Sequence, residues 1–332
     1  MENQNPIYPA DPGENISSQA GTADLPKPEL EEKKDKVNIW LKSAFSLLLY
    51  LAIGYFFFSH NWMFLVIITA IIVFHELGHF SAMKIFKYND LGIFFIPLLG
   101  AYVSGSKQEI SQKQSAIILL AGPVPGILLG IVLILLNNVY SIDFAFGISV
   151  EAIAKAMIFL NLLNLLPVYP LDGGQLLHRL FLDDNKIIGK IFVIMSSGLL
   201  SWFALSSGFY PLLIFPFMML SRMVGDIHHD RLTAKIEAEG IDLMKTYDEL
   251  SAEDYWKIRN LLIKHIPSLR DVPPSPPYDI SPKEEQVITT IQSLLQRTLI
   301  QDLSLAGKFL ILLIWAGCFT APFMLQLPLR FF

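Results

Sequence analysis

Seven apolar segments, most of them near the ~20 residues that a helix needs to cross a bilayer, constrain this chain more than any other feature. Because backbone polar groups find no water inside a bilayer, such segments span it as helices. Of the 332 residues, 53% are hydrophobic and only 17% are charged, which is typical of a membrane protein. We therefore predict an all-α polytopic membrane protein with about seven transmembrane helices, at residues 39–58, 62–86, 115–136, 150–166, 187–206, 210–223 and 305–325.

Polar segments indicate four parts along the chain. Residues 1–36 are polar and of mixed charge, and we expect a disordered cytosolic tail rather than a signal peptide. Residues 37–223 form the predicted membrane domain, and residues 305–332 contain the last transmembrane helix. Between them, residues 224–304 are expected to be a small cytosolic helical region. Its predicted elements are helices at 234–244, 252–266 and 282–302 and a Pro-rich linker at 273–277.

Residues 91–105 are apolar, but the segment contains Pro97 and is too short for a spanning helix. We interpret it as a re-entrant loop or a short strand pair. Non-helical backbone is tolerated at membrane depth only where it is buried in protein or lines a wet cavity. We therefore expect this segment to lie inside the membrane domain.

Lysine and arginine are more frequent in the cytoplasmic connections of membrane proteins. The connections at 59–61, 137–149 and 207–209 contain neither residue, whereas the N-terminal tail and the alternate connections contain several. We therefore expect the N-terminus to face the cytosol, in a multi-pass protein of a prokaryotic inner membrane. In this orientation the second and fourth predicted spans both run toward the cytosol.

His75, Glu76 and His79 form the pattern His-Glu-x-x-His inside the second apolar segment. Residues four apart lie on one face of a helix, so the two imidazoles can bind one Zn²⁺ while Glu76 lies beside it as a general base. Ionisable side chains in a hydrocarbon segment are costly, which favours a functional role over incidental polar residues. Zinc then needs a third protein ligand and an open position for water.

A third ligand is available at the end of the fourth predicted span. There Pro167 and Pro170 break the helix, and two glycines follow the lone carboxylate of Asp172. We predict an unwound turn that presents Asp172 to the interior, at the same cytosolic depth as the two histidines. Alternatively, Asp172 is the N-cap of a short helix at 173–182, and the two roles do not exclude each other.

Together these motifs resemble the site-2 protease family of intramembrane zinc metalloproteases. Residues 75–79 (HELGH) and 164–174 (NLLPVYPLDGG) carry the resemblance, in the order and spacing of the family. It implies a three-helix zinc protease core at about residues 66–182. The implied site residues are His75, His79 and Asp172 as ligands of one Zn²⁺ per chain, Glu76 as the catalytic residue, and Asn164 as the residue that engages the substrate or the reacting carbonyl.

One element departs from the family pattern. Family members often have Gly-Pro-x-x-Asn in the helix after the re-entrant segment, whereas here Gly122 and Pro123 are followed by Gly126 in place of the Asn. We expect this change to affect local helix packing rather than catalysis. No inserted PDZ-like domain is expected, because the connections inside the core are too short to hold one.

The resemblance implies hydrolysis of peptide bonds within or near transmembrane segments, in regulated intramembrane proteolysis. The expected partners are a transmembrane protein substrate and the lipid bilayer; the sequence specifies neither the substrate nor the oligomeric state. A net charge of −5 and the lack of a dense basic run give no support to nucleic-acid binding. The single cysteine, Cys318, excludes an intrachain disulfide and a cysteine-based zinc site, and we expect it to be a packing residue.

Two other interpretations compete with a protease. A non-proteolytic metal-binding scaffold or regulator with the same fold would be free to lose Glu76, yet Glu76 is present. A transporter would use the buried ionisable residues as an ion path, but no paired internal repeat of broken helices is visible.

Overall fold

The computed structural model describes residues 26–28, 38–57, 61–107, 110–140, 149–182, 186–273, 283–295 and 299–324. The chain divides into two compact units, each treated by itself. The first, which we call the membrane unit, comprises Lys33–Ile227 and Arg297–Phe332; the second, the polar unit, comprises Met1–Glu32 and His228–Gln296. Except for residues 26–28, the predicted disordered tail lies outside the described residues.

Six segments of the described chain are helical, long and apolar enough to cross a membrane, and they indicate an integral membrane protein. They correspond to α1 (Ile39–Phe57), α2 (Trp62–Ile85), α3 with α4 (Gln112–Ala121 and Pro123–Tyr140), α7 (Lys186–Ser207), η3 with α8 (Tyr210–Leu213 and Ile214–Ala238) and α11 (Leu305–Met324). The expected fourth span is instead α5 (Val150–Asn164), whose 15 residues are fewer than the ~20 that cross a bilayer. The prediction of seven spans is therefore not confirmed.

Local sequence accounts for several helix ends. Asn61, Ser111 and Ser149 each precede a helix, and their side-chain oxygens accept hydrogen bonds from backbone N–H groups in the first turns of α2, α3 and α5. The break between α3 and α4 falls at Pro123, which lacks a backbone N–H and is favoured at the first position of a helix. The span predicted at 115–136 thus lies within one candidate span that consists of two consecutive helices.

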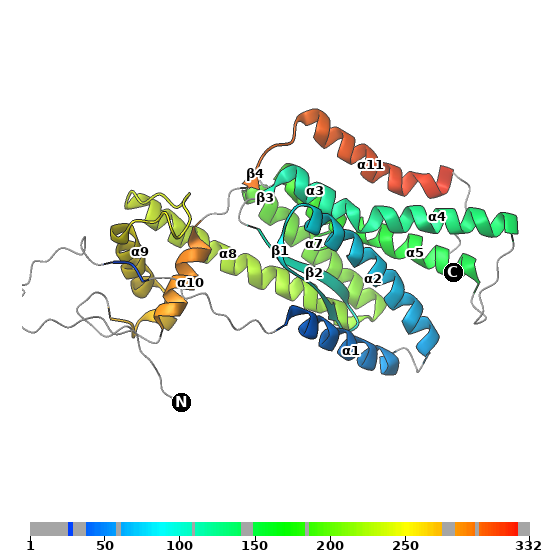
Figure 1. Ribbon diagram of the computed structural model, residues 1–332, viewed down its shortest axis with the longest axis horizontal. Coiled ribbons are helices and arrows are strands. Elements are labelled where there is room, and N and C mark those ends of the chain that lie inside the picture. The colour runs from blue at the N-terminus through cyan, green and yellow to red at the C-terminus, as the bar shows by residue number, and fades with distance from the viewer. Residues whose placement is uncertain are drawn as a thin grey trace, which may run out of the picture. The chain divides into compact units, whose positions relative to one another are not determined.

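The membrane unit has its main core between α4 and α5. The buried side chains there include Ile127, Ile131 and Ile134 of α4 and Ala154 and Ile158 of α5. Helix α2 lies between this pair and a β-hairpin (Figure 1). Cys318 of α11 is buried in the same core, in agreement with its expected packing role.

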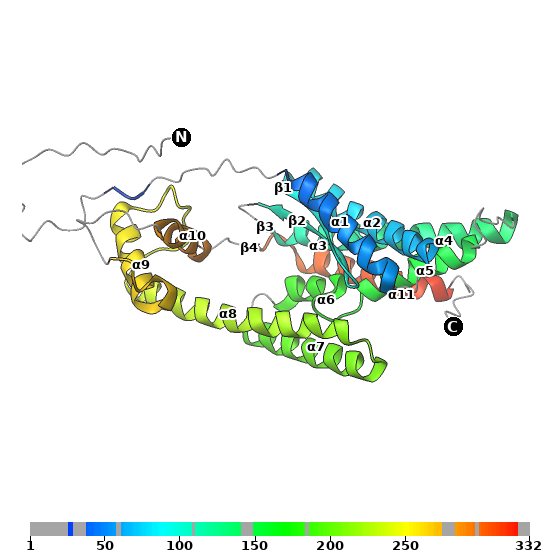
Figure 2. The ribbon, with the colours of Figure 1, turned by 90° about the horizontal axis from the view of Figure 1, so that it is seen from below.

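A second helix pair is formed by α7 and the first part of α8, which run side by side (Figure 2). Ser197 of α7 contacts Met219 of α8, with the hydroxyl 3.8 Å from the sulfur. Many apolar side chains of this pair are exposed, including Trp202, Phe203 and Phe217. Exposed aromatic and aliphatic residues of this kind suit contact with lipid.

The segment predicted as a re-entrant loop or a strand pair is a strand pair. β1 (Asn89–Ile96) pairs antiparallel with β2 (Gly100–Ser106), with Ile93 opposite Val103 and Phe95 opposite Ala101. Ile93 and Phe95 are buried against Tyr50 of α1 and Leu65 of α2. The hairpin is therefore part of the packed interior rather than a mobile loop.

The two edges of the hairpin differ. The backbone N–H of Phe95 in β1 donates to Ser46 Oγ of α1 at 3.1 Å, so α1 covers that edge. Directly opposite residues in an antiparallel pair exchange either both hydrogen bonds or none. Because the N–H of Phe95 points away from β2, the N–H and C=O groups of Ala101 and Val103 point outward from β2. Among the described residues, β2 pairs with no other strand.

Two of the three helices predicted in residues 224–304 are found, one of them shorter than expected, and the third is wrong. α9 (Ala252–His265) agrees with the expected helix at 252–266. The expected helix at 234–244 is wrong, because α8 continues through this region to Ala238 and the chain then turns at Gly240, where φ is +79°. The expected helix at 282–302 is confirmed as α10 (Glu284–Leu294), but its predicted end is wrong, because residues 299–300 form a strand. Residues 274–277 of the Pro-rich linker lie outside the described residues.

After α10 the chain returns to the membrane unit through a short strand. β4 (Leu299–Ile300) pairs in parallel with β3 (Ile110–Ser111), directly before α3. Asp302 accepts hydrogen bonds from the Ser111 hydroxyl at 2.6 Å and from the Lys113 backbone at 3.0 Å. Desolvation acts to raise the pKa of Asp302, but hydrogen bonds, these two among them, together outweigh it and lower the pKa. Asp302 thereby ties the start of α11 to the start of α3.

The polar unit has its own core, organised around a buried ion pair. Arg259 of α9 and Glu284 of α10 form two hydrogen bonds, Nε to Oε1 at 2.7 Å and Nη2 to Oε2 at 2.8 Å. The Tyr255 hydroxyl also donates to Glu284 Oε1 at 2.7 Å. Burial and the adjacent carboxylate raise the pKa of Tyr255, so this hydroxyl stays protonated at neutral pH.

We expect Arg259→Ala to destabilise the polar unit by about 3–5 kcal/mol, because the buried carboxylate of Glu284 would lose its bidentate partner. The full-length protein is titrated with denaturant, and limited proteolysis within residues 228–296 reports the midpoint at which the polar unit unfolds. The matched control is Lys257→Ala, which breaks the exposed Lys257–Glu253 pair and should leave the midpoint unchanged. Equal midpoints for the two variants would contradict this role of the ion pair.

Candidate metal centre

Helix α2 brings His75, Glu76 and His79 into the interior of the membrane unit. The three residues are between 5% and 8% exposed. His75 and His79 lie one turn apart on the same face of the helix, with ring centroids 4.7 Å apart. Because ionisable groups are costly to bury, each of these side chains needs a polar partner or a bound cation.

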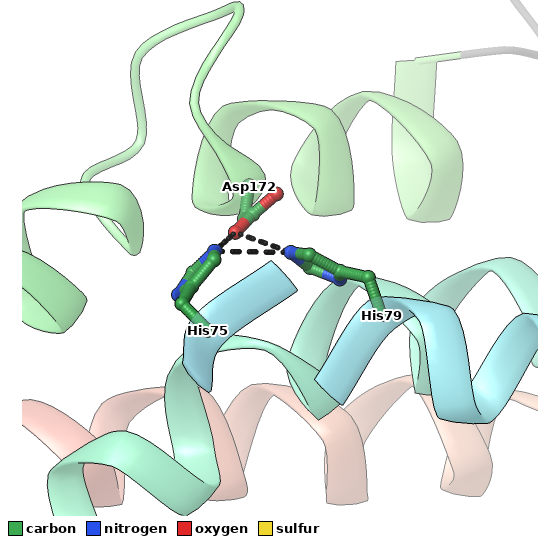
Figure 3. A group of neighbouring side chains, drawn as sticks. All are labelled: His75, His79 and Asp172. Carbon is green, nitrogen blue, oxygen red and sulfur yellow. Dashed lines mark hydrogen bonds and ion pairs between the residues drawn. The ribbon is translucent and has the colours of Figure 1, made fainter. Parts of the chain in front are cut away.

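Asp172 reaches the histidines from the second motif. Helix α5 ends at Asn164, and the following turn leads into α6 (Asp172–Leu177). The N-cap of α6 is Leu171, and no side chain makes a capping hydrogen bond there. The alternative expectation that Asp172 is the N-cap is therefore wrong. Its carboxylate points toward the two histidines instead (Figure 3).

Hydrogen bonds to three side chains hold the turn before Asp172. Trp315 Nε1 of α11 donates to the Leu165 carbonyl at 2.8 Å. Ser196 Oγ of α7 accepts from the backbone N–H of Tyr169 at 3.1 Å. The Gln175 side chain donates to the Pro170 carbonyl at 2.9 Å. The position of the carboxylate thus depends on helices far apart in the sequence.

Three atoms from these residues converge on one point. Asp172 Oδ2 lies 3.0 Å from His75 Nε2 and 3.2 Å from His79 Nε2, and the two Nε2 atoms are 3.0 Å apart (Figure 3). Within the described parts of the chain, this is the only group of three or more His, Cys, Asp or Glu side chains that meets the distance requirement for a shared metal ion. The structure thus brings together the three predicted ligands.

The other ring nitrogens determine what these atoms offer. His79 Nδ1 lies 2.7 Å from the Ile118 carbonyl, and His75 Nδ1 lies 2.8 Å from Asn161 Oδ1. Both partners are oxygen acceptors, so each Nδ1 carries the proton and each neutral imidazole presents a lone pair at Nε2. The site therefore contains two nitrogen lone pairs and a carboxylate oxygen that face one another. Such a set requires a shared proton or a cation.

The geometry fits a zinc ion. Tetrahedral zinc with ligands at ~2.0–2.1 Å separates its ligand atoms by ~3.3 Å, close to the distances between these three atoms. Two histidines and a carboxylate leave a fourth position open, as in catalytic zinc sites. Glu76 lies beside the group, and its Oε2 is buried without a hydrogen-bond partner among the described residues. An orphaned carboxylate oxygen of this kind is consistent with a nearby water or ion.

Two asparagines of α5 also lie at the site. Asn164, predicted from the second motif, has Nδ2 3.4 Å from His75 Nε2, so its amide lies near the point where the three atoms converge. Asn161 had no predicted role, although it hydrogen-bonds directly to His75. The available signal was an amide about one turn before Asn164, in the apolar second half of the helix.

A second polar cluster in the sequence does not form such a site. Asp226, His228, His229 and Asp230 all lie on α8, and His229 Nε2 contacts the Ser293 carbonyl at 3.1 Å. In the described residues they do not belong to a group with metal-binding distances.

Comparisons with known proteins support the resemblance drawn from the motifs. Residues 63–157 match Peptidase family M50. A zinc metalloprotease of Methanocaldococcus jannaschii is 26% identical over 179 residues, which cover 50% of this chain and 52% of that protein. Stage IV sporulation protein FB of Bacillus subtilis is 30% identical over 121 residues, 35% of this chain and 40% of that protein. These sequence matches agree with a zinc metalloprotease, as the motifs predicted.

The matches do not extend over whole proteins. The chain spans about half of the first relative's length and less of the second's. Among solved structures, a site-2 protease of Methanocaldococcus jannaschii shares 21% identity, with 54% of this chain and 84% of that chain covered and a TM-score of 0.40. At this TM-score the likeness adds nothing to the sequence matches.

Loss of a residue that hydrogen-bonds to a metal ligand typically lowers metal affinity about 10- to 100-fold. We expect His79→Ala and Asp172→Asn to lower zinc affinity by more than this, because each removes a ligand atom itself. Glu76→Gln should retain zinc at the wild-type stoichiometry. Elemental analysis of protein purified in detergent, combined with chelator competition, measures both quantities. A normal zinc content in Asp172→Asn would show that the carboxylate is not a ligand.

Proposed function

We propose that this chain, which is similar to Peptidase family M50 and to a zinc metalloprotease, is an intramembrane zinc metalloprotease of the site-2 protease kind. It would hydrolyse peptide bonds within or near transmembrane segments of other membrane proteins. One observation carries this proposal. Two imidazole nitrogens and a carboxylate oxygen meet within a buried site, with a second carboxylate, Glu76, beside them. The set matches one catalytic zinc per chain.

The proposed reaction divides the work among named side chains. When bound at this site, zinc supplies polarisation of the scissile carbonyl and lowers the pKa of water. Glu76 accepts a proton from the attacking water at Oε2, which has no hydrogen-bond partner in the described part of the chain, and passes it to the nitrogen of the leaving amine. His75, His79 and Asp172 hold the metal without taking part in this proton transfer.

Asn164 is assigned to the reacting carbonyl. Its amide nitrogen lies 3.4 Å from His75 Nε2, next to the convergence point of the ligand atoms. An N–H donor there can stabilise the negative charge that develops on the carbonyl oxygen. Asn164 is the last residue of α5, and the next residue is held by Trp315, so the amide is presented from a fixed backbone.

Substrate binding is assigned to the outer edge of β2. A transmembrane substrate has to lose helical hydrogen bonds before cleavage, and addition to a strand edge replaces them. Ala101 and Val103 present outward N–H and C=O groups that can pair with an extended segment. β1 and β2 both pack against α2, the helix that carries His75 and Glu76.

Several finer features belong to the same proposal. We assign the N-terminus and the site to the cytosolic side of a prokaryotic inner membrane, from the distribution of Lys and Arg. α5 then enters the membrane without spanning it alone, since its 15 residues are short for that purpose. Residues 224–304 are assigned to the cytosol, and the biological role to regulated intramembrane proteolysis of a transmembrane substrate.

Glu76→Gln should abolish cleavage, because an amide cannot accept the proton from water. The expected loss of activity is complete within the sensitivity of the assay, although the variant keeps its zinc. Cleavage of a generic transmembrane model substrate in detergent, measured beside zinc content, separates the two effects. Wild-type turnover by zinc-loaded Glu76→Gln protein would refute the assignment; zinc binding without cleavage by the wild type would favour a scaffold.

Val103→Pro should lower kcat/KM by between about 2- and 12-fold, the equivalent of one lost hydrogen bond, because proline removes an N–H that points outward from β2. Zinc content should not change. Val103→Ala is the matched control, since it removes side-chain contacts but keeps the N–H. Equal kinetics for the two variants would argue against pairing of the substrate with this edge.

A further inference from the structure

Asn161 is a polar side chain in apolar surroundings. It is 1% exposed, and its helix packs against α4 through Ile158 and Ala154. An amide buried in this way is costly unless its oxygen and nitrogen both find partners. Both do, since Nδ2 donates to the Met157 carbonyl at 2.7 Å and Oδ1 lies 2.8 Å from His75 Nδ1.

These two contacts determine the orientation of the amide. A backbone carbonyl can only accept a hydrogen bond, so the Asn161 atom that faces Met157 must be the nitrogen. The oxygen therefore faces His75 and can only accept from Nδ1. Nδ1 of His75 then carries the proton, and Nε2 is left with its lone pair toward Asp172 and His79.

Gly126 of the adjacent helix α4 provides the space for this amide. A Cβ atom at position 126 would lie 2.6 Å from Asn161 Cγ and 2.7 Å from Oδ1, and it would contact Nδ2 more closely still. Real Cβ atoms do not approach other heavy atoms this closely. Because hydrogen bonds at both ends hold the amide, it cannot move aside without losing at least one of them. Only glycine at position 126 is compatible with the observed contact.

We propose that Asn161 and Gly126 act together as a positioning device for the metal ligand His75. The amide of Asn161 selects the tautomer and the ring orientation of His75, and Gly126 leaves the volume that the amide occupies. The inference rests on the proposed zinc site. It adds Asn161, which contacts the ligand His75 rather than the metal. Position 126, where this chain has Gly instead of the Asn that is common in the family, is thereby explained: the amide at this place comes from Asn161 of the neighbouring helix.

The device predicts a specific pattern in metal affinity. Asn161→Ala leaves the Nδ1–H of His75 without its acceptor and should weaken zinc binding about 10- to 100-fold, the range typical for loss of a hydrogen bond behind a ligand. Gly126→Ala should weaken it as well, because the new Cβ displaces the amide. In the double variant Asn161→Ala/Gly126→Asn, an amide is restored from α4 into the space vacated on α5, and affinity should recover at least in part.

The experiment compares these variants with wild type and with Asn138→Ala, a matched control that removes an exposed amide from α4. Apparent zinc affinity is measured by chelator competition on full-length protein in detergent, and cleavage of a model substrate is measured separately. Far-UV circular dichroism and size-exclusion chromatography monitor folding. The expected result is weaker zinc binding in both single variants, recovery in the double variant and no change in the control.

Two results would overturn the inference. Wild-type zinc affinity in Asn161→Ala would exclude a positioning role, and a double variant no better than Asn161→Ala would attribute the loss to packing rather than to the amide. Failure of the proposed function has a different signature. In that case wild type binds zinc, the variants follow the expected order of affinity, and none of them cleaves the substrate.

Discussion

Two imidazole lone pairs and a carboxylate oxygen lie within 3.0–3.2 Å of one another in the interior of an apolar helical unit. Three acceptors so close together are unfavourable unless they share a proton or a cation. A metal ion is the species that best resolves this arrangement, and zinc fits its distances and ligand types. The bound cation would therefore both stabilise the buried ligand atoms and provide the site's chemistry.

Much of the surrounding structure can be understood as support for these three atoms. Helix α2 provides two of them with a spacing that the helix itself determines. The third comes from a turn whose carbonyls and N–H groups are bound by Trp315 and Ser196, from two different helices. Behind the histidines, the Ile118 carbonyl and the Asn161 amide hold the Nδ1 protons. Ligand side chains that are already oriented by such hydrogen bonds lose little conformational entropy when the metal binds.

The parts of the site that could be predicted from sequence are those with local patterns. The two histidines and Glu76 lie within five residues of one helix, and two prolines and two glycines mark the turn around Asp172. Asn161 could not be assigned, because its partner is 86 positions away and no local pattern shows which face of α5 contacts α2. The space at Gly126 is likewise visible only when α4 and α5 are packed together.

The fold shows the same division. The short strand pair, the helix at α9 and most apolar helices follow from local composition. The apolar turn after Asn164 made the fourth predicted span longer than α5 is. The length of helix α8 was underestimated, because the polar residues after Arg222 suggested that the helix ends there. It continues to Ala238. A helix that leaves the apolar region can change its composition without changing its backbone.

X-ray absorption spectroscopy at the zinc K-edge of the purified wild-type protein tests the central claim most directly. The account predicts a first shell of nitrogen and oxygen atoms at ~2.0–2.1 Å, with outer-shell scattering from two imidazole rings. Loss of one imidazole is expected in His79→Ala protein that has been reloaded with zinc. A spectrum with no histidine scattering, or with more than two imidazoles around the metal, would contradict a site made by His75, His79 and Asp172.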